Sequence, residues 1–189
     1  MRNTVMTHKG FKRLRAWLML VVLALPLTLT APIAHADDST IVGDYVEGLL
    51  AYGSSDYNTA LENWRPLAKQ GVALAQYNLA LMYYHGEGVE RDLKEAARLY
   101  RLAAEQGVAS AQNNLGVMYK NGEGVFQDLE KSYMWLTLAW VNGDEKAPEA
   151  RHLVKQQMRL DFSLGDVAIK RTEKAARQCY DSNYQDCGR

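Results

Sequence analysis

Few side chains in this sequence could do chemistry, and the two cysteines are the first to consider. Cys179 and Cys187 lie eight positions apart near the C-terminus, and His85 and His152 are the only histidines beyond residue 36. Two cysteines without a nearby histidine cannot complete a four-ligand zinc site, and the CxxC spacing of catalytic dithiols is absent. The pair therefore predicts a structural disulfide that closes a short terminal loop, as expected in an oxidising compartment.

The sequence lacks the motifs of the common catalytic centres. It contains no Ser-x-x-Lys, Gly-x-Ser-x-Gly, His-Glu-x-x-His or Gly-x-x-x-x-Gly-Lys. The segments Gly86-Glu87-Gly88 and Gly122-Glu123-Gly124 lack the third glycine of a dinucleotide fingerprint, and each follows a helical pattern, so they indicate helix ends. We expect His85 at such an end and His152 partly exposed on a helix. The sequence therefore predicts no catalytic, cofactor-binding or metal-binding residue, and a protein that is not an enzyme.

Residues 1–36 have the order of a secretory signal peptide. Basic residues up to Arg15 precede an apolar run at 16–25, and the segment ends in the small-x-small sequence Ala34-His35-Ala36. This order predicts cleavage after Ala36. A retained signal anchor is the alternative, disfavoured by a short apolar run and two prolines. We expect an exported protein, periplasmic or secreted, without stable membrane insertion after cleavage.

The net charge of the chain changes once that segment is set aside. Residues 1–36 carry five basic and no acidic residues, so 17 of the 22 basic residues remain beside all 22 acidic ones, a net charge of −5 with neutral histidines. A nucleic-acid surface needs a basic face that displaces counterions, and anionic lipid attracts basic segments. The mildly acidic body disfavours both classes of partner.

A repeat of 36 residues organises the middle of the chain. Residues 73–93 and 109–129 are identical at 13 of 21 positions without a gap. Within each copy, apolar residues recur at helical spacing before the Gly-Glu-Gly helix end. A helix pair cannot bury its apolar stripe alone, so the pattern predicts pairs that stack on one another.

Each repeat is expected to form two helices. The first, at about 73–85, has an apolar face of Ala75, Leu79, Met82 and Tyr83, and Ala75, Ala80 and Gly116 are small enough for close helix packing. The second starts at Asp92, where Asp92 and Glu95 can form a capping box, and ends at Gly107. Its predicted buried residues are Ala96, Leu99, Tyr100 and Ala103.

The repeated pattern resembles the Sel-one-like repeat, which is related to the tetratricopeptide repeat. The carriers of the resemblance are Ala-x-Ala-Gln-x-Asn-Leu, Met-Tyr, Gly-Glu-Gly-Val and Asp-Leu, in that order in both copies. The resemblance implies an all-α fold, a right-handed α/α solenoid of helix pairs. Proteins of this kind bind other proteins or peptides, so it also implies a protein partner.

Weaker patterns on either side complete the predicted organisation. The solenoid is expected at 37–145, with a partial pair at about 41–71 and full pairs at about 73–107 and 109–143. Residues 146–189 are expected to form a C-terminal helical cap that ends in the disulfide loop. The tail helices are predicted at about 144–158 and 163–179, with a second possible capping box at Ser163–Asp166. The aromatic residues assigned to the core are Trp64, Tyr83, Tyr100, Tyr119, Trp135 and Trp140.

The first helices of such stacks line a concave groove, and the resemblance implies which residues face it. They are Leu74, Tyr77, Leu81 and Tyr84 in the first copy and Ser110, Asn113, Val117 and Lys120 in the second. Large amphipathic side chains such as Tyr77 and Tyr84 make good interface anchors. The alternative for some of these positions is ordinary core beneath the neighbouring helix.

Three functions stay open at this stage. The leading interpretation is a non-enzymatic exported adaptor or scaffold, in envelope regulation or assembly. The second, suggested by repeat relatives that carry a disulfide in every repeat, is an enzyme acting on β-lactams or the cell wall, although those repeat cysteines are absent here. The third is a structural protein that associates with itself.

Overall fold

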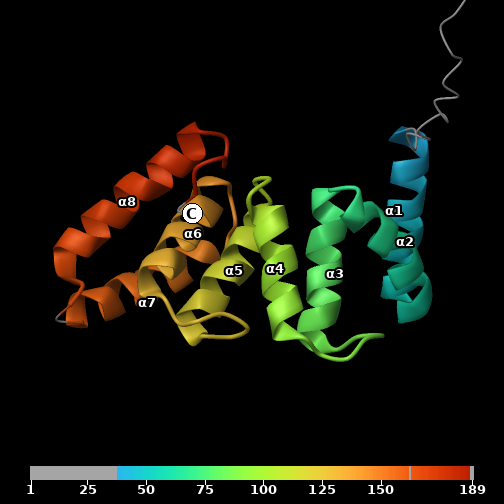
Figure 1. Ribbon diagram of the computed structural model, residues 1–189, viewed down its shortest axis with the longest axis horizontal. Helices are drawn as coiled ribbons and strands as arrows, with labels where there is room; N and C mark the ends of the chain where they lie inside the picture. Colours follow the sequence, from blue (N-terminus) through green and yellow to red (C-terminus); the bar gives the residue numbers. More distant parts are fainter. Residues whose placement is uncertain (1–37, 162, 188–189) are drawn as a thin grey trace, which may run out of the picture. The chain divides into compact units, whose positions relative to one another are not determined.

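The computed structural model describes residues 38–161 and 163–187 and is drawn in Figure 1. The predicted signal peptide, residues 1–36, lies outside the described residues. The described chain folds into eight helices and no strand: α1 Asp38–Gly53, α2 Tyr57–Lys69, α3 Ala73–His85, α4 Leu93–Ala104, α5 Ala109–Asn121, α6 Leu129–Val141, α7 Ala147–Leu160 and α8 Gly165–Asp181. None of these helices is both long and apolar enough to cross a membrane. The predicted all-α fold is confirmed.

The helices follow one another as pairs, α1–α2, α3–α4 and α5–α6, and each pair packs on the next (Figure 1). The second helix of each pair contacts the first helix of the following pair, so α2 packs on α3, α4 on α5 and α6 on α7. The last helix departs from this pattern, because α8 packs more extensively on α6 than on α7.

An aspartate caps the second helix of each repeated pair. Asp56, Asp92 and Asp128 precede α2, α4 and α6, and each side chain accepts a hydrogen bond from a first-turn amide. Such a cap stabilises a helix by about 1 kcal/mol. The predicted capping box at Asp92 is only half formed, since the Glu95 carboxylate turns away and accepts from Arg98 one turn further on.

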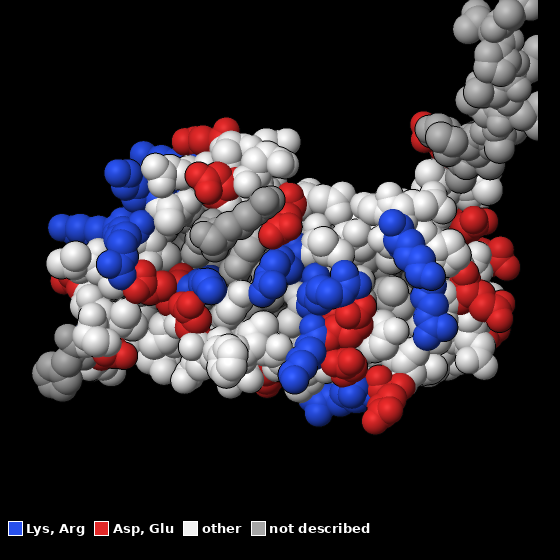
Figure 2. Space-filling model, in the orientation of Figure 1, with Lys and Arg blue, Asp and Glu red and all other residues white. Residues whose placement is uncertain are grey.

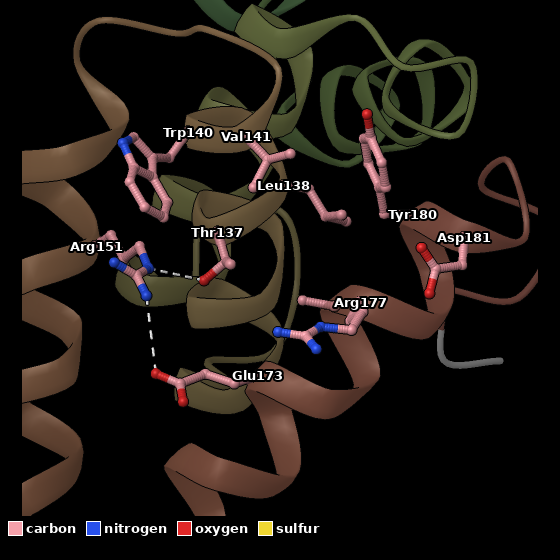
Figure 3. Close-up of a pocket in the computed structure, with 10 residues that line it drawn as sticks. Thr137, Leu138, Trp140, Val141, Arg151, Glu173, Arg177, Tyr180 and Asp181 are labelled. Carbon is pink, nitrogen blue, oxygen red and sulfur yellow. Dashed lines mark hydrogen bonds and ion pairs between the residues drawn. The ribbon is translucent and has the colours of Figure 1, made fainter.

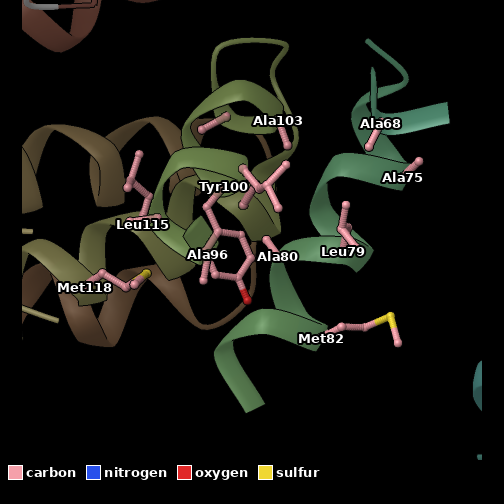
Figure 4. Packing of buried hydrophobic residues seen from close by; sticks show 14 of the residues in the cluster. Ala68, Ala75, Leu79, Ala80, Met82, Ala96, Tyr100, Ala103, Leu115 and Met118 are labelled. Atoms are coloured by element: carbon pink, nitrogen blue, oxygen red, sulfur yellow. The ribbon is translucent and has the colours of Figure 1, made fainter. Parts of the chain in front are cut away.

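Small residues allow the helices of the repeats to approach closely (Figure 4). Ala75, Ala80 and Ala96 are fully buried, and a Cβ at Gly116 would lie 2.7 Å from Cγ of Leu136 on the paired helix. At Gly116 the absence of a side chain therefore leaves room for Leu136, as close packing requires.

Two buried glutamines tie successive pairs together. Gln76 Nε2 donates to the Ala68 carbonyl at the end of α2, at 3.1 Å, and Gln112 repeats this bond with Ala104 at the end of α4, at 3.0 Å. Each glutamine Oε1 also accepts a hydrogen bond of 2.8 Å from an amide side chain 30 residues further on. These bonds satisfy carbonyls that end a helix and set the register between pairs.

Trp140 is a correction to the predicted core. Trp64, Tyr100, Tyr119 and Trp135 are buried as expected and Tyr83 is half-buried, but Trp140 is 50% exposed. It lies in the last turn of α6, where α8 leaves one side of the ring open, and the guanidinium carbon of Arg151 lies 4.9 Å from the ring centroid.

The C-terminal loop packs against the repeats. The predicted disulfide Cys179–Cys187 is present, with a Cα–Cα distance of 4.6 Å, and Cys179 is fully buried in the main core. The Tyr184 hydroxyl donates to the Asn142 side chain at 2.9 Å, and its ring lies against Gly107, where a Cβ would be 2.9 Å away. The loop therefore covers the ends of α4 and α6.

The predicted capping box before α8 is wrong. The helix starts at Gly165 without a side-chain cap. The Ser163 hydroxyl donates instead to Asp161 at 2.6 Å, and Asp166 pairs with Arg159 of α7 at 3.2 Å. Ser163 and Asp166 therefore make contacts across the turn between α7 and α8 and do not cap α8.

Candidate functional site

A cleft of about 310 Å³ lies between the first helices of the two full pairs, α3 and α5. Its walls carry aromatic and aliphatic side chains, and its lining is Tyr77, Leu81, Tyr84, His85, Tyr100, Asn114, Val117, Met118 and Lys146. We refer to it as the α3–α5 cleft.

The helical period places three of these side chains on one face of α3, where they are partly buried against the core. Tyr77, Leu81 and Tyr84 recur at intervals of four and three on α3, on the face turned away from buried Leu79. Tyr100 of α4 forms the floor, with its ring centroid 5.9 Å from that of Tyr77. Burial raises the pKa of both hydroxyls above the ordinary tyrosine value.

A tyrosine–glutamate hydrogen bond fixes one wall of the cleft. The Tyr84 hydroxyl donates to the Glu123 carboxylate in the loop of the following pair at 2.8 Å. Tyr52 makes the same kind of bond, at 2.7 Å, to Glu87. The carboxylate that accepts the bond raises the pKa of Tyr84. The glutamate of each Gly-Glu-Gly segment thus anchors the preceding pair, a role that sequence reasoning missed because the bond spans two pairs.

The structure brings four of the predicted groove residues together and separates the others. Tyr77, Leu81, Tyr84 and Val117 line the cleft, whereas Leu74, Ser110 and Lys120 do not. Leu74 is 48% exposed outside it.

Asn113 is a correction, because its side chain is buried rather than groove-facing. It stands 36 positions after Tyr77, and its shorter side chain ends below the surface that the tyrosine ring reaches. Its neighbour Asn114 lines the cleft instead.

The polar groups at the rim of the cleft do not form a catalytic arrangement with the residues described. His85 is exposed and contacts the Tyr84 ring edge-on at 5.1 Å. In the described part of the chain, no three His, Cys, Asp or Glu side chains cluster closely enough to hold a metal ion. The lining can therefore offer apolar contact, aromatic rings, hydroxyl groups and one ammonium group to an occupant.

A second cavity, of about 520 Å³, opens where α8 departs from the repeat (Figure 3). Trp140 and Tyr180 form part of its wall, and both are about half exposed. Its charged groups are partly paired, since Arg151 lies 3.8 Å from Glu173 and donates to the Thr137 hydroxyl. Sequence reasoning missed this cavity because it depends on where α8 packs.

Known proteins with similar sequences and structures also contain the repeat that the sequence predicts. The model of the Sel1 repeat matches residues 73–108 and 109–139. The protein c5321, a protective antigen present in uropathogenic Escherichia coli strains and displaying an SLR fold, is 28% identical over 76% of this chain, with a TM-score of 0.68. A Sel1 repeat protein from Oxalobacter formigenes is 31% identical over 60% of this chain, with a TM-score of 0.57.

This chain spans only 30% and 34% of the lengths of those two solved chains. None of the curated proteins matches it. The matched segments coincide with α3–α4 and α5–α6, whose pairing the structure shows. The chain therefore carries two Sel1 repeats within an α/α solenoid fold.

Proposed function

We propose that this chain is a non-enzymatic interaction protein that holds a segment of another protein in the α3–α5 cleft. Sel1 repeat proteins generally act as protein-interaction scaffolds. The observation that carries the proposal is the open cleft itself, in which Tyr77, Leu81 and Tyr84 of one repeat face Val117 of the next. Aromatic and aliphatic side chains of this kind are the usual anchors at protein interfaces.

The lining indicates the chemistry of the bound segment. A volume of about 310 Å³ accommodates one or two side chains, so the segment would be anchored by a large apolar residue. Lys146 lines the cleft, and its ammonium group has no ion-pair partner among the described residues. An acidic group beside the apolar anchor would supply that partner.

The disulfide supports a proposal for the compartment. An intramolecular bridge such as Cys179–Cys187 is consistent with an exported protein, because thiols in the cytosol are kept reduced. We place the protein in the periplasm or outside the cell, where it would act as an adaptor in envelope regulation or assembly.

Site-specific photo-crosslinking in intact cells tests the proposal. A photoreactive phenylalanine derivative would replace Leu81 or Tyr84 in the cleft, and Glu62 or Lys94 as matched exposed controls on α2 and α4. We expect both cleft positions to capture the same protein and the controls to capture none. Capture of the same protein from all four positions, or from the controls alone, would contradict the cleft assignment.

A separate assay addresses the enzyme alternative. The purified protein would be incubated with a labelled penicillin and with a chromogenic cephalosporin. We expect neither covalent labelling nor turnover, and either of these results would overturn the non-enzymatic proposal.

A further inference from the structure

The first helix of the stack exposes an apolar stripe. On α1, Val42, Val46, Leu49 and Leu50 are 60%, 45%, 42% and 71% exposed. Their spacing of four, three and one places them along one side of the helix. No preceding helix among the described residues covers this side, because α1 is the first helix that the structure describes.

The repeat shows which part of this stripe corresponds to a packed position in the other pairs, since Leu50 is equivalent to buried Met82 whereas Leu49 is equivalent to Leu81 in the cleft. Gly48, Ala80 and Gly116 are equivalent positions in α1, α3 and α5, which makes Glu47 equivalent to Leu79 and Leu115. Both leucines are buried, on the first helices that pack against the second helix of the preceding pair.

In α1 that position is acidic. Glu47 replaces the buried leucine, and Asp44 replaces the glutamine that bonds to the preceding helix in α3 and α5. With Asp38, α1 carries three acidic residues and no basic one. Neither Asp44 nor Glu47 has an ion-pair partner among the described residues.

The last helix of the stack carries the opposite charge on its exposed side. Lys170, Lys174 and Arg177 follow one another along α8 at intervals of four and three, and all are exposed. Val167, 78% exposed, extends the same stripe by one turn. None of the three cations is paired with a described residue. In Figure 2, acidic side chains gather at the α1–α2 edge, while the α7–α8 edge shows basic side chains with acidic ones among them.

We propose that these two ends bind each other, so that α1 of one copy packs against α8 of a second copy. The contact would resemble those within the stack, where α2 packs on α3 and α4 on α5, although α8 itself packs mainly on α6. It would set Asp44 and Glu47 opposite Lys170 and Lys174, with Leu50 and Val167 in apolar contact. A symmetric contact of α1 with α1 would instead place acidic groups against acidic groups.

Two consequences follow from this geometry. A head-to-tail contact leaves one unpaired end on each copy, so association produces chains whose mean length rises with protein concentration. The chains stay open unless the rotation between successive copies closes them into a ring. Exposed ion pairs are screened by salt, so the chains shorten as ionic strength increases. The surfaces involved lie outside the α3–α5 cleft, so this inference is independent of the proposed function.

Sedimentation velocity of the purified protein tests the inference with charge reversals at either end. The head variant is Asp44→Lys with Glu47→Lys, and the tail variant is Lys170→Glu with Lys174→Glu. Glu62→Lys with Glu90→Lys, and Lys69→Glu with Lys94→Glu, are controls of the same charge change at exposed sites elsewhere.

We expect the wild-type protein and the controls to associate, and either end variant to lose association by about tenfold or more in affinity, the equivalent of two lost ion pairs and new repulsion. Mixing the head and tail variants restores association, because each then meets its complement. A monomeric wild-type protein, an unaffected tail variant, or a mixture that stays monomeric would overturn the proposal.

Discussion

Gly124→Ala is expected to destabilise the stack through a contact between two pairs. Gly124 has φ +66°, and a Cβ built on it would overlap the carbonyl oxygen of Leu93, the first residue of α4. The group in the way is backbone at the start of a capped helix, so it cannot move aside as a side chain would. The second glycine of the Gly-Glu-Gly segment is therefore required for the approach of neighbouring pairs.

Gly143→Ala is the matched control for this substitution. Gly143 has φ +88°, and its Cβ would meet nothing within 4 Å. In both variants the alanine must therefore adopt a left-handed backbone conformation, which costs about 1–2 kcal/mol. Only Gly124→Ala adds the cost of overpacking, about 1–3 kcal/mol. We expect the free energy of unfolding to fall by about 1–2 kcal/mol for Gly143→Ala and about 2–5 kcal/mol for Gly124→Ala.

Urea unfolding followed by far-ultraviolet circular dichroism measures both free energies. The slope of the unfolding free energy against urea should match that of the wild type in each variant, so that the difference reports the folded state. Equal free energies of unfolding for the two variants would refute the reasoning, because the strain of the left-handed backbone would then account for the whole effect.

Two further predictions concern pH and redox state. Burial and the hydrogen bond to Glu87 raise the pKa of Tyr52 to about 12; since this exceeds the ordinary tyrosine value, its stabilising effect is complete below about pH 10 and is lost as the pH rises toward 12. Tyr52→Phe should therefore lose less stability than the wild type between pH 9 and pH 11 in chemical unfolding, and equal losses would contradict this. Reduction of Cys179–Cys187 should lower the unfolding free energy by about 2–3 kcal/mol while the helical circular dichroism at 25 °C persists, and complete loss of helix on reduction would show that the loop is essential to the repeats.

Much of the fold can be predicted from the sequence because the same pattern of apolar residues and helix ends occurs in two copies. The spacing of Ala75, Leu79 and Met82 recurs 36 residues later, and all three side chains are buried. The aspartate at the start of α2, α4 and α6 and the glycine after α3 and α5 are local signals, and their bonds form within one turn. Features of this kind depend on neighbours in the chain, so sequence reasoning reaches them.

Features that depend on helices distant in sequence were the ones missed. Trp140 has the same apolar character as buried Trp135, but it stands five positions later, about 140° further around α6. Its ring lies against Arg151 of α7 and stays half exposed. The bond from Tyr84 to Glu123 joins residues 39 apart, while the equivalent bond of Tyr52 spans 35. A fixed repeat period does not reveal a contact whose spacing varies between pairs.

The candidate site was predictable in part for the same reasons. Helical period and the family register placed Tyr77, Leu81 and Tyr84 on one face of α3, and the structure shows these three side chains lining the α3–α5 cleft. The family register wrongly predicted that Asn113 faces the groove, because a register fixes the position of the backbone and not how far the side chain reaches. Lys146 comes from the start of α7, outside the repeat, and no repeat pattern could have assigned it.

Methyl resonances of the cleft, followed while the captured partner protein is added, test the central claim most directly. Leu81 and Val117 carry methyl groups inside the cleft, and Leu153 carries exposed methyl groups on α7 outside it. The account predicts that the Leu81 and Val117 resonances shift together and saturate with the partner while those of Leu153 stay in place. Saturable binding that shifts Leu153 and leaves Leu81 and Val117 unchanged would contradict it.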